Sequence, residues 1–237
     1  MSTTANTPAR VSVVIPALNE QETIGAVVRA VPRESAREVV VVDNGSDDRT
    51  AERASAAGAR VVREPRRGYG RACRAGALAV AESCEIIVFL DGDGSDCPEL
   101  MNRLIEPITM GTHDFVLGSR TRGEREPGSM NFQQLFAGRA AGVLTRALYG
   151  VRYTDMCPFR AIRRDALARL GMREETYGWN LEMQMRAARA RLRILEVPVE
   201  HRRRAGGDSK VSGTWRGTLL AATRILYTAA RIASERT

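Results

Sequence analysis

Cysteine, histidine and lysine are scarce in this sequence, and the scarcity of the first two excludes particular kinds of site. The four cysteines include no CxxC pair, so neither a disulfide framework nor a zinc site is indicated, and a reducing cytoplasm fits. The only histidines, His113 and His201, are too few for a histidine-rich metal centre. Lys210 is the only lysine among 36 basic residues, which makes it notable because lysine and arginine bind phosphate differently.

Long apolar runs and aromatic residues are lacking as well. No apolar segment approaches the roughly 20 residues that span a bilayer. Residues 1–10 are short and polar, so we expect a disordered N-terminal tail and no signal peptide. Aromatic residues make up 5% of the chain without a base-stacking motif, which argues against nucleic-acid binding. We therefore expect a cytoplasmic protein that can lie peripherally at the inner face of a membrane.

The residues that are present suit a folded domain with a basic surface. Apolar residues make up 43% of the chain and charged residues 27%, which supports both a core and a solvated surface. A length of 237 residues is enough for one large α/β domain. The formal net charge of +8 favours anionic partners such as nucleotides, sugar phosphates or acidic lipid.

Apolar runs alternate with helical patterns over the first half of the chain. This β-α alternation predicts a single-domain α/β fold with a doubly wound, mostly parallel sheet flanked by helices. Strands are predicted at 11–16, 38–43, 59–63, 85–91, 114–118 and 192–199, and helices at about 20–32, 47–57, 68–82, 98–110, 132–149, 163–170 and 180–190. Asn19 is the predicted N-cap of the first helix. A mobile loop is predicted at 121–131.

The C-terminal region differs in sequence pattern from the α/β domain that precedes it. We expect the main domain to cover residues 11–213, ending in a basic, glycine-rich loop from 202 to 213. That loop is either a solvated charge run or a clamp for phosphate. Residues 214–237 are predicted to form an amphipathic helix, which can pack on the domain or on an anionic membrane.

The segment Asp91-Gly92-Asp93 follows a strongly apolar predicted strand. Two carboxylates one residue apart beyond a strand end can hold a divalent cation against a diphosphate, and hard oxygen ligands select Mg²⁺ or Mn²⁺. Such a cation would neutralise charge on a departing nucleoside diphosphate. The alternative is an ordinary aspartate-glycine turn, which is common after strands.

Two further polar segments follow predicted strands. Asp43 ends the second strand and is followed by Asn44-Gly45-Ser46; a carboxylate there can accept hydrogen bonds from a base or a ribose. The segment from Pro16 to Glu20 ends the first strand. Because ligands bind at the carboxyl ends of parallel strands, we expect these segments to lie together with Asp91 and Asp93. Turn formation and helix capping are the structural alternatives.

Taken in order, these segments resemble family 2 glycosyltransferases, which have the GT-A (nucleotide-diphospho-sugar transferase) fold. The matching stretches are 13–20, 41–50 and 89–93. Later stretches resemble dolichyl-phosphate mannose synthase and its bacterial polyprenyl-phosphate relatives, and they lie at 114–120, 154–160, 196–198 and 204–210. The resemblance runs from about residue 11 to 212 and implies an inverting hexosyltransferase that uses a GDP-mannose or UDP-glucose type of donor.

The resemblance also implies residue roles. For the nucleotide sugar it implies Pro16, Ala17, Asn19, Glu20, Asp43, Gly45, Gly70, Asp91, Gly92 and Arg120; for phosphate or acceptor, Arg160, Arg204, Ser209 and Lys210; and for the metal, Asp91 and Asp93. Two positions depart from the family pattern: Ser95 stands where glutamine is frequent, and Cys157-Pro158 replaces a common Ser-Gly. Proline removes a backbone donor, so the acceptor wall is expected to differ there.

The acceptor decides which group, if any, serves as a base. A polyprenyl phosphate is already anionic near neutral pH and needs positive charge more than a base. A hydroxyl acceptor on a metabolite or glycan would require a base, for which Asp155 or Glu182 is the candidate, with Asp93 as a further catalytic carboxylate. A nucleotidyltransferase is a distant alternative, because the first strand is not followed by the glycine-rich basic loop that it would need.

Overall fold

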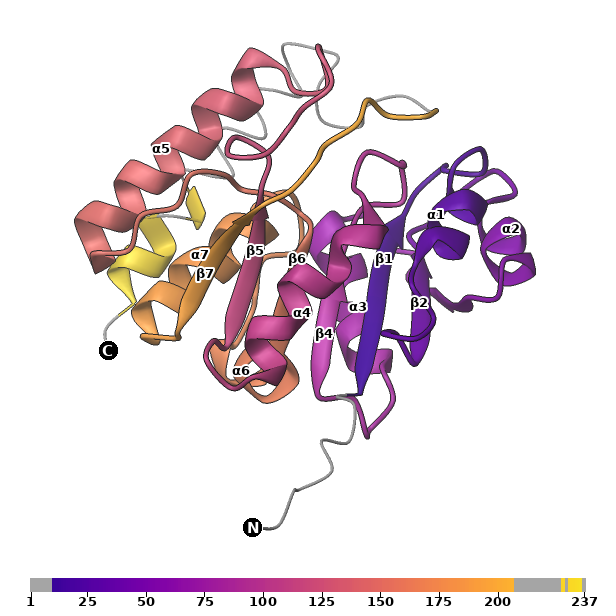
Figure 1. Cartoon of the computed structure of the whole chain (residues 1–237), viewed down its shortest axis with the longest axis horizontal. Helices are drawn as coiled ribbons and strands as arrows, with labels where there is room; N and C mark the ends of the chain where they lie inside the picture. The colour runs from indigo at the N-terminus through magenta and orange to yellow at the C-terminus, as the bar shows by residue number, and fades with distance from the viewer. Residues whose placement is uncertain (1–9, 207–226, 229, 236–237) are drawn as a thin grey trace.

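The computed structural model describes residues 10–206, 227–228 and 230–235, and its centre is one seven-stranded sheet (Figure 1). The strand order is β3-β2-β1-β4-β6-β5-β7. The strands are β1 (Val11–Ala17), β2 (Glu38–Asp43), β3 (Arg60–Arg63), β4 (Ile86–Phe89), β5 (Phe115–Ser119), β6 (Arg160–Arg163) and β7 (Ile194–Pro198). The α/β architecture predicted from the sequence is confirmed.

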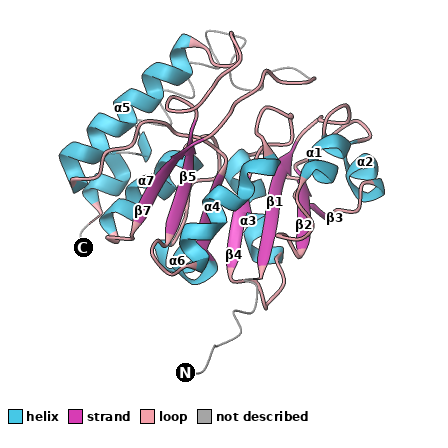
Figure 2. Cartoon of the chain, in the orientation of Figure 1, coloured by secondary structure: helices cyan, strands magenta, loops and turns pink. Residues whose placement is uncertain are grey.

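Helices cover both faces of this sheet (Figure 2). They are α1 (Ile24–Ala30), α2 (Thr50–Ala56), α3 (Tyr69–Ala79), α4 (Met101–Thr109), α5 (Phe132–Tyr149), α6 (Arg164–Leu170) and α7 (Trp179–Arg189), and a 3-10 turn at Pro98–Leu100 precedes α4. One core joins the sheet to α1, α2 and α4, and a second joins it to α3, α6 and α7. A doubly wound sheet requires cores on both faces.

The central strand β1 shows why these residues form a strand covered on both sides. All seven of its residues are buried. Successive side chains point to opposite faces, so Val13 and Ile15 enter the first core while Val14 enters the second. Each fully buried valine or isoleucine side chain contributes about 1.5–3 kcal/mol. The run therefore has no polar alternation, as expected for a central parallel strand.

The strand β6 was not among the predicted strands. It pairs antiparallel with β4 over four residues and with β5 over three, while the remaining pairs in the sheet are parallel. The short segment Arg160–Arg163 begins and ends with arginine, so it carries no apolar run that local patterning could detect. The segment becomes a strand because it lies between β4 and β5 and pairs with both, although they are distant in the sequence.

The predicted N-cap role of Asn19 is wrong. The helix α1 begins at Ile24, with Thr23 as N-cap. Asn19 instead has a left-handed backbone (φ 52°), and its side chain accepts a hydrogen bond from the backbone N–H of Asp47 at 2.9 Å. Its own N–H donates to Ser46 Oγ at 3.0 Å. Asn19 thus ties the loop after β1 to the loop after β2.

The described end of the chain packs on the domain. Residues 227–228 and 230–234 are helical. Ile232 is buried against Leu181 and Met185 of α7, and Glu235 pairs with Arg186 at 2.8 Å. The predicted N-terminal tail and most of the predicted C-terminal helix lie outside the described residues. Among the helices that the structure describes, none is both long and apolar enough to cross a bilayer.

Candidate active site

Three aspartates gather just beyond the carboxyl end of β4. Asp91 Oδ1 accepts a hydrogen bond from the Tyr69 hydroxyl at 3.1 Å, and the Asp91 N–H donates to Asp96 Oδ2 at 3.0 Å. Asp93 Oδ1 accepts from the N–H and hydroxyl of Ser95 at 2.9 and 2.6 Å. These bonds hold the three side chains in one loop, where the charges of Asp93 and Asp96 act on Asp91.

Electrostatics make this cluster a candidate for a cation. Burial and the neighbouring charges of Asp96 and Asp93 raise the pKa of Asp91 well above its ordinary value, and burial raises the pKa of Asp96 to about 7. A divalent cation would relieve the repulsion between these carboxylates, so the residues fit Mg²⁺ or Mn²⁺. Among the described residues, no group of three or more acidic, histidine or cysteine side chains is arranged to enclose a metal by itself. Oxygens of a bound diphosphate would have to complete the coordination.

A basic residue from the segment that follows β7 reaches this cluster. Arg204 Nε lies 3.3 Å from Asp93 Oδ2, and Arg204 Nη2 lies 2.6 Å from Glu20 Oε1. The backbone runs alongside the aspartate loop, because the N–H of Arg202 donates to the Ser95 carbonyl at 2.9 Å and that of Ala205 to the Asp93 carbonyl at 3.1 Å. The predicted phosphate residue Arg204 therefore lies beside the predicted metal residues.

The predicted nucleotide loops lie at the same edge of the sheet. In the parallel pair of β1 and β2, Pro16 is opposite Val42 and Ala17 is opposite Asp43. Asp43 is buried, and its Oδ1 accepts from the Ser46 N–H at 3.0 Å. Two glycines shape this edge: Gly45 has a positive φ of 79°, and Gly92 accepts a bond from the Thr23 hydroxyl at 2.7 Å. Segments predicted separately from the sequence are thus brought together.

Arg120 and Asp155 form a buried, two-pronged ion pair. Arg120 Nε donates to Asp155 Oδ2 and Nη2 to Oδ1, both at 2.8 Å, and the Arg120 N–H adds a bond to Oδ2 at 2.9 Å. Burial alone would raise the pKa of Asp155, but the hydrogen bonds and charge of Arg120 outweigh it and lower the pKa. Asp155 is therefore an anion whose two oxygens are occupied by Arg120, and it fixes the guanidinium in place.

Glu196 supports this pair from β7, a role that sequence reasoning missed. Its carboxylate accepts from the Thr154 N–H at 2.9 and 3.1 Å and from the Thr154 hydroxyl at 3.0 Å. The N–H of Asp155 points to the same carboxylate at 3.4 Å. Burial raises the pKa of Glu196. A glutamate inside an otherwise apolar strand was the available signal, because a partly buried carboxylate requires partners.

The structure places Glu182 in a structural network, which corrects its assignment as a catalytic base. The residue is fully buried in α7. Its Oε1 contacts Arg186 at 2.9 Å and Arg231 at 2.8 Å, and its Oε2 accepts from the backbone N–H of Arg173 at 2.9 Å and of Glu174 at 2.5 Å. These bonds join α7 to the C-terminal segment and leave the carboxylate no position from which to take a proton from an acceptor.

Two more predicted site residues have structural positions. Arg160 is fully buried, donates to the carbonyls of Cys157 and Asn180, and lies over the Phe115 ring at 5.9 Å, so it does not reach the surface to hold a phosphate or acceptor. Gly70 opens α3 where any Cβ would collide with the Glu174 carbonyl, so close packing explains the glycine without a nucleotide. Ser209 and Lys210 lie outside the described residues.

Other residues near the aspartates were not predicted from the sequence. Tyr69 and Asp96 contact Asp91 directly. His201 is buried, with Nδ1 3.9 Å from Asp96 Oδ1, and burial lowers its pKa to about 4, so the ring is neutral at physiological pH. The spacing Asp91-x-Asp93-x-x-Asp96 was visible in the sequence, but the approach of Tyr69 and His201 depends on the fold.

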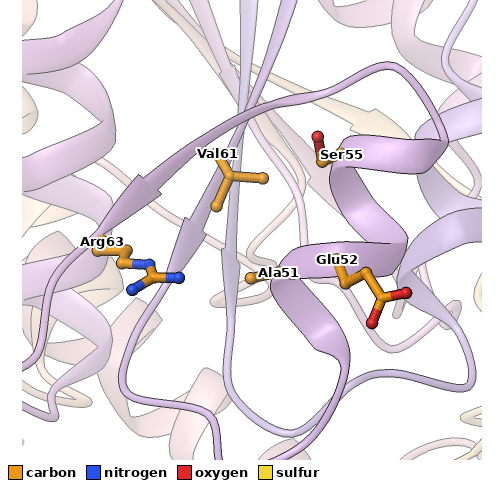
Figure 3. Close-up of a pocket in the computed structure, with 5 residues that line it drawn as sticks. All are labelled: Ala51, Glu52, Ser55, Val61 and Arg63. Carbon is orange, nitrogen blue, oxygen red and sulfur yellow. The ribbon is translucent and has the colours of Figure 1, made fainter.

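Two surface hollows lie away from this cluster. One of about 410 Å³ is lined by Ala51, Glu52, Ser55, Val61 and Arg63, between α2 and β3 (Figure 3). The other, of about 1140 Å³, includes Val11 and Ile86 at the amino ends of β1 and β4. Neither contains a residue predicted to bind the donor or metal, so the candidate site is defined by the aspartates and loops at the carboxyl ends.

Solved structures with this architecture include glucosyl-3-phosphoglycerate synthase from Mycobacterium tuberculosis in complex with phosphoglyceric acid. It is 24% identical and superimposes with a TM-score of 0.75 over 94% of this chain and 80% of that one. Another structure of the same enzyme, with Mn²⁺, uridine diphosphate and glucosyl-3-phosphoglycerate, has a TM-score of 0.74 at 24% identity, with coverage of 94% and 80%. At these identities the likeness establishes the GT-A fold.

Sequence comparison identifies the family. An undecaprenyl-phosphate mannosyltransferase of Micrococcus luteus is 33% identical over 86% of this chain and 88% of its own, and a dolichyl-phosphate hexose transferase of Haloferax volcanii is 36% identical over 82% and 84%. An uncharacterised glycosyltransferase of Mycobacterium tuberculosis is 38% identical over 89% and 94%. The profile of glycosyl transferase family 2 matches residues 12–171. The chain therefore belongs to glycosyl transferase family 2 and is a glycosyltransferase.

Proposed function

We propose that this enzyme transfers a hexose, with inversion, from a nucleotide-diphosphate sugar of the GDP-mannose or UDP-glucose type to a polyprenyl phosphate. The observation that carries the proposal is the position of Asp91 and Asp93 beside the loops after β1 and β2, with Arg204 next to them. Nucleotides bind at this edge of parallel sheets. The acceptor is inferred from the names of the relatives in Micrococcus luteus and Haloferax volcanii.

Asp91 and Asp93 would hold Mg²⁺ or Mn²⁺, and the cation would neutralise charge on the departing nucleoside diphosphate. Glu20, Asn19 and Asp43 would line the nucleoside side, where the loops after β1 and β2 are already tied together. Arg204 would exchange its contact with Asp93 for the diphosphate, since guanidinium forks suit phosphate oxygens.

The ion pair of Arg120 and Asp155 supports a phosphate acceptor over a hydroxyl acceptor. A hydroxyl nucleophile would need a free base, whereas both oxygens of Asp155 are engaged by Arg120. A phosphate monoester carries its own negative charge near neutral pH and requires a positive group to position it. Arg120, held rigidly by Asp155, is suited to that task.

The direct test incubates the protein with labelled GDP-mannose or UDP-glucose, Mg²⁺ or Mn²⁺, and either a short polyprenyl phosphate or a panel of hydroxyl acceptors. We expect metal-dependent label in the lipid product and none in the hydroxyl acceptors. Asp93→Asn serves as the inactive control. Product with hydroxyl acceptors alone would overturn the lipid proposal. Turnover in the presence of a metal chelator would overturn the proposed metal dependence.

A further inference from the structure

Helix α5 has one face inside the protein and one face outside. The inward residues Gly138, Ala141, Gly142 and Thr145 are buried. On the other side, residues spaced by four and three positions form a single exposed stripe, which we call the α5 stripe: Phe132, Phe136, Arg139, Val143 and Arg146. Figure 1 shows α5 as an outer helix at the edge of the domain that carries β7.

The apolar residues of the α5 stripe are unusually open to solvent. Phe132 is 78% exposed, Phe136 64% and Val143 70%. The two phenylalanine rings stack on each other with centroids 6.4 Å apart. Aromatic rings grouped on the surface of a helix mark a contact surface more often than a plain solvated face.

The charge of α5 indicates what this surface contacts. Among its residues, Phe132–Tyr149, there is no aspartate or glutamate, and its two charged residues are Arg139 and Arg146, both exposed. A helix with aromatic residues and arginines on one face, and no acidic residue, is complementary to the headgroups and upper acyl chains of an anionic bilayer. The net charge of +8 adds long-range attraction to the same surface.

We propose that the α5 stripe docks the enzyme on a bilayer that contains anionic lipid, with Phe132 and Phe136 inserted below the headgroups and Arg139 and Arg146 beside them. The proposed role of this docking, to bring the enzyme to a lipid acceptor, rests on the proposed polyprenyl-phosphate acceptor. The docking itself does not depend on it. At the described end of the chain, Ile232 and Glu235 pack on α7.

The position of α5 connects the bilayer to the candidate site. A Cβ at Gly138 would lie 3.6 Å from the Asp155 Cα, so the inward face of α5 packs against the residue that fixes Arg120. An α-helix is about 10 Å across with its side chains. A bilayer on the α5 stripe therefore lies about one helix diameter from the Arg120–Asp155 pair. A lipid-linked phosphate could reach that pair while its chain remains in the membrane.

Co-sedimentation with vesicles tests the surface without any turnover. Wild-type protein should partition onto vesicles of phosphatidylcholine with phosphatidylglycerol and less onto pure phosphatidylcholine. The double variant Phe132→Ser, Phe136→Ser should bind at least about tenfold more weakly. Arg139→Gln with Arg146→Gln should lose the preference for phosphatidylglycerol and its salt dependence. The matched control is Leu78→Ser with Met110→Ser, which are 75% and 70% exposed elsewhere and should bind as wild type does.

Three results would overturn the proposal: no binding of wild-type protein to the anionic vesicles, unchanged binding of the phenylalanine variant, or equal loss in the control. If the phenylalanine variant instead changes the oligomeric state in size-exclusion chromatography with unchanged vesicle binding, the α5 stripe joins two copies of the chain and the proposal fails. Vesicle binding without transfer to lipid would refute the proposed function and leave the docking surface standing. Transfer to detergent-solubilised lipid without vesicle binding would refute the docking surface and leave the proposed function standing.

Discussion

Arg204 and Asp93 lie in contact although they are distant in the chain, with Nε 3.3 Å from Oδ2. The same guanidinium also contacts Glu20 at 2.6 Å. A positive group thus occupies Asp93, one of the two carboxylates that would hold the proposed cation. A metal that binds at Asp93 has to compete with Arg204, and a donor diphosphate gives Arg204 a new partner.

Replacement of Arg204 tests this competition. We expect Arg204→Gln to bind Mn²⁺ more tightly than wild type without a donor, by about two- to fivefold, because a partly exposed ion pair contributes about 0.2–1 kcal/mol. With the donor, turnover should fall, since the diphosphate loses a cationic partner. Isothermal titration and steady-state kinetics measure the two effects. Arg202→Gln, which removes an exposed pair with Glu99, is the control. Unchanged or weaker Mn²⁺ binding in Arg204→Gln would contradict the competition.

The acidic cluster gives a separate prediction. Asp91→Asn or Asp93→Asn should lower turnover by about 10²-fold or more, because the cation that stabilises the leaving group is lost. The melting temperature without metal should not fall, since each change removes charge from a repelling cluster. The melting-temperature rise on addition of Mn²⁺ with donor should disappear. Asp47→Asn, on the exposed loop after β2, should retain both properties. Full activity in either cluster variant would refute the assignment.

The Arg120–Asp155 pair should behave as a buried unit. Asp155→Ala leaves Arg120 charged and buried, so we expect a loss of about 3–5 kcal/mol in the free energy of unfolding. Removal of both charges in Arg120→Met with Asp155→Leu should cost less than the sum of the two single changes. Urea unfolding of the four proteins completes the cycle. Additive losses would mean that the two side chains do not stabilise each other.

Acid should weaken the same pair in a defined direction. Arg120 lowers the pKa of Asp155 in the folded protein, whereas the unfolded value is about 3.9. The contribution of Asp155 is therefore fully present above about pH 4 and is lost as the pH falls through the lower, folded pKa. The stability difference between wild type and Asp155→Asn should be constant from pH 7 to about 5 and shrink below about pH 4. A difference that grows on acidification would contradict the assignment of the ionised form.

Replacement of Glu182 tests whether its carboxylate is structural or acts as a catalytic base. Glu182→Gln should reduce the free energy of unfolding by about 3 kcal/mol, because Arg186 and Arg231 lose a shared buried carboxylate and, among the described residues, Arg186 keeps only Glu235. Turnover at a temperature where the variant stays folded should remain within about threefold of wild type, whereas loss of a general base removes about 10²–10⁴-fold. Circular dichroism and kinetics on one preparation separate the effects. A stable but inactive Glu182→Gln would restore the base assignment.

Local sequence patterns predicted many of the strands and helices. Uninterrupted apolar runs identified β1, β2 and β4, because strands buried on both faces have no polar side. A helix was predicted at 132–149, and α5 has these bounds. The polar segments that follow these strands were predicted to converge, since parallel strands end at one edge of a sheet. Each of these features depends on neighbouring residues.

The fate of buried charges was decided by tertiary structure. Arg160 and Glu182 were expected at the site, yet the fold buries both and gives them internal partners. Glu196 and Arg120 acquire their roles only when β7 and β5 pair and the loop at Asp155 folds against them. The sequence alone does not show whether a charged side chain lies in water, binds a ligand or pairs with a buried partner. The energy of desolvation and the identity of that partner depend on residues far along the chain, so only the three-dimensional arrangement could settle them.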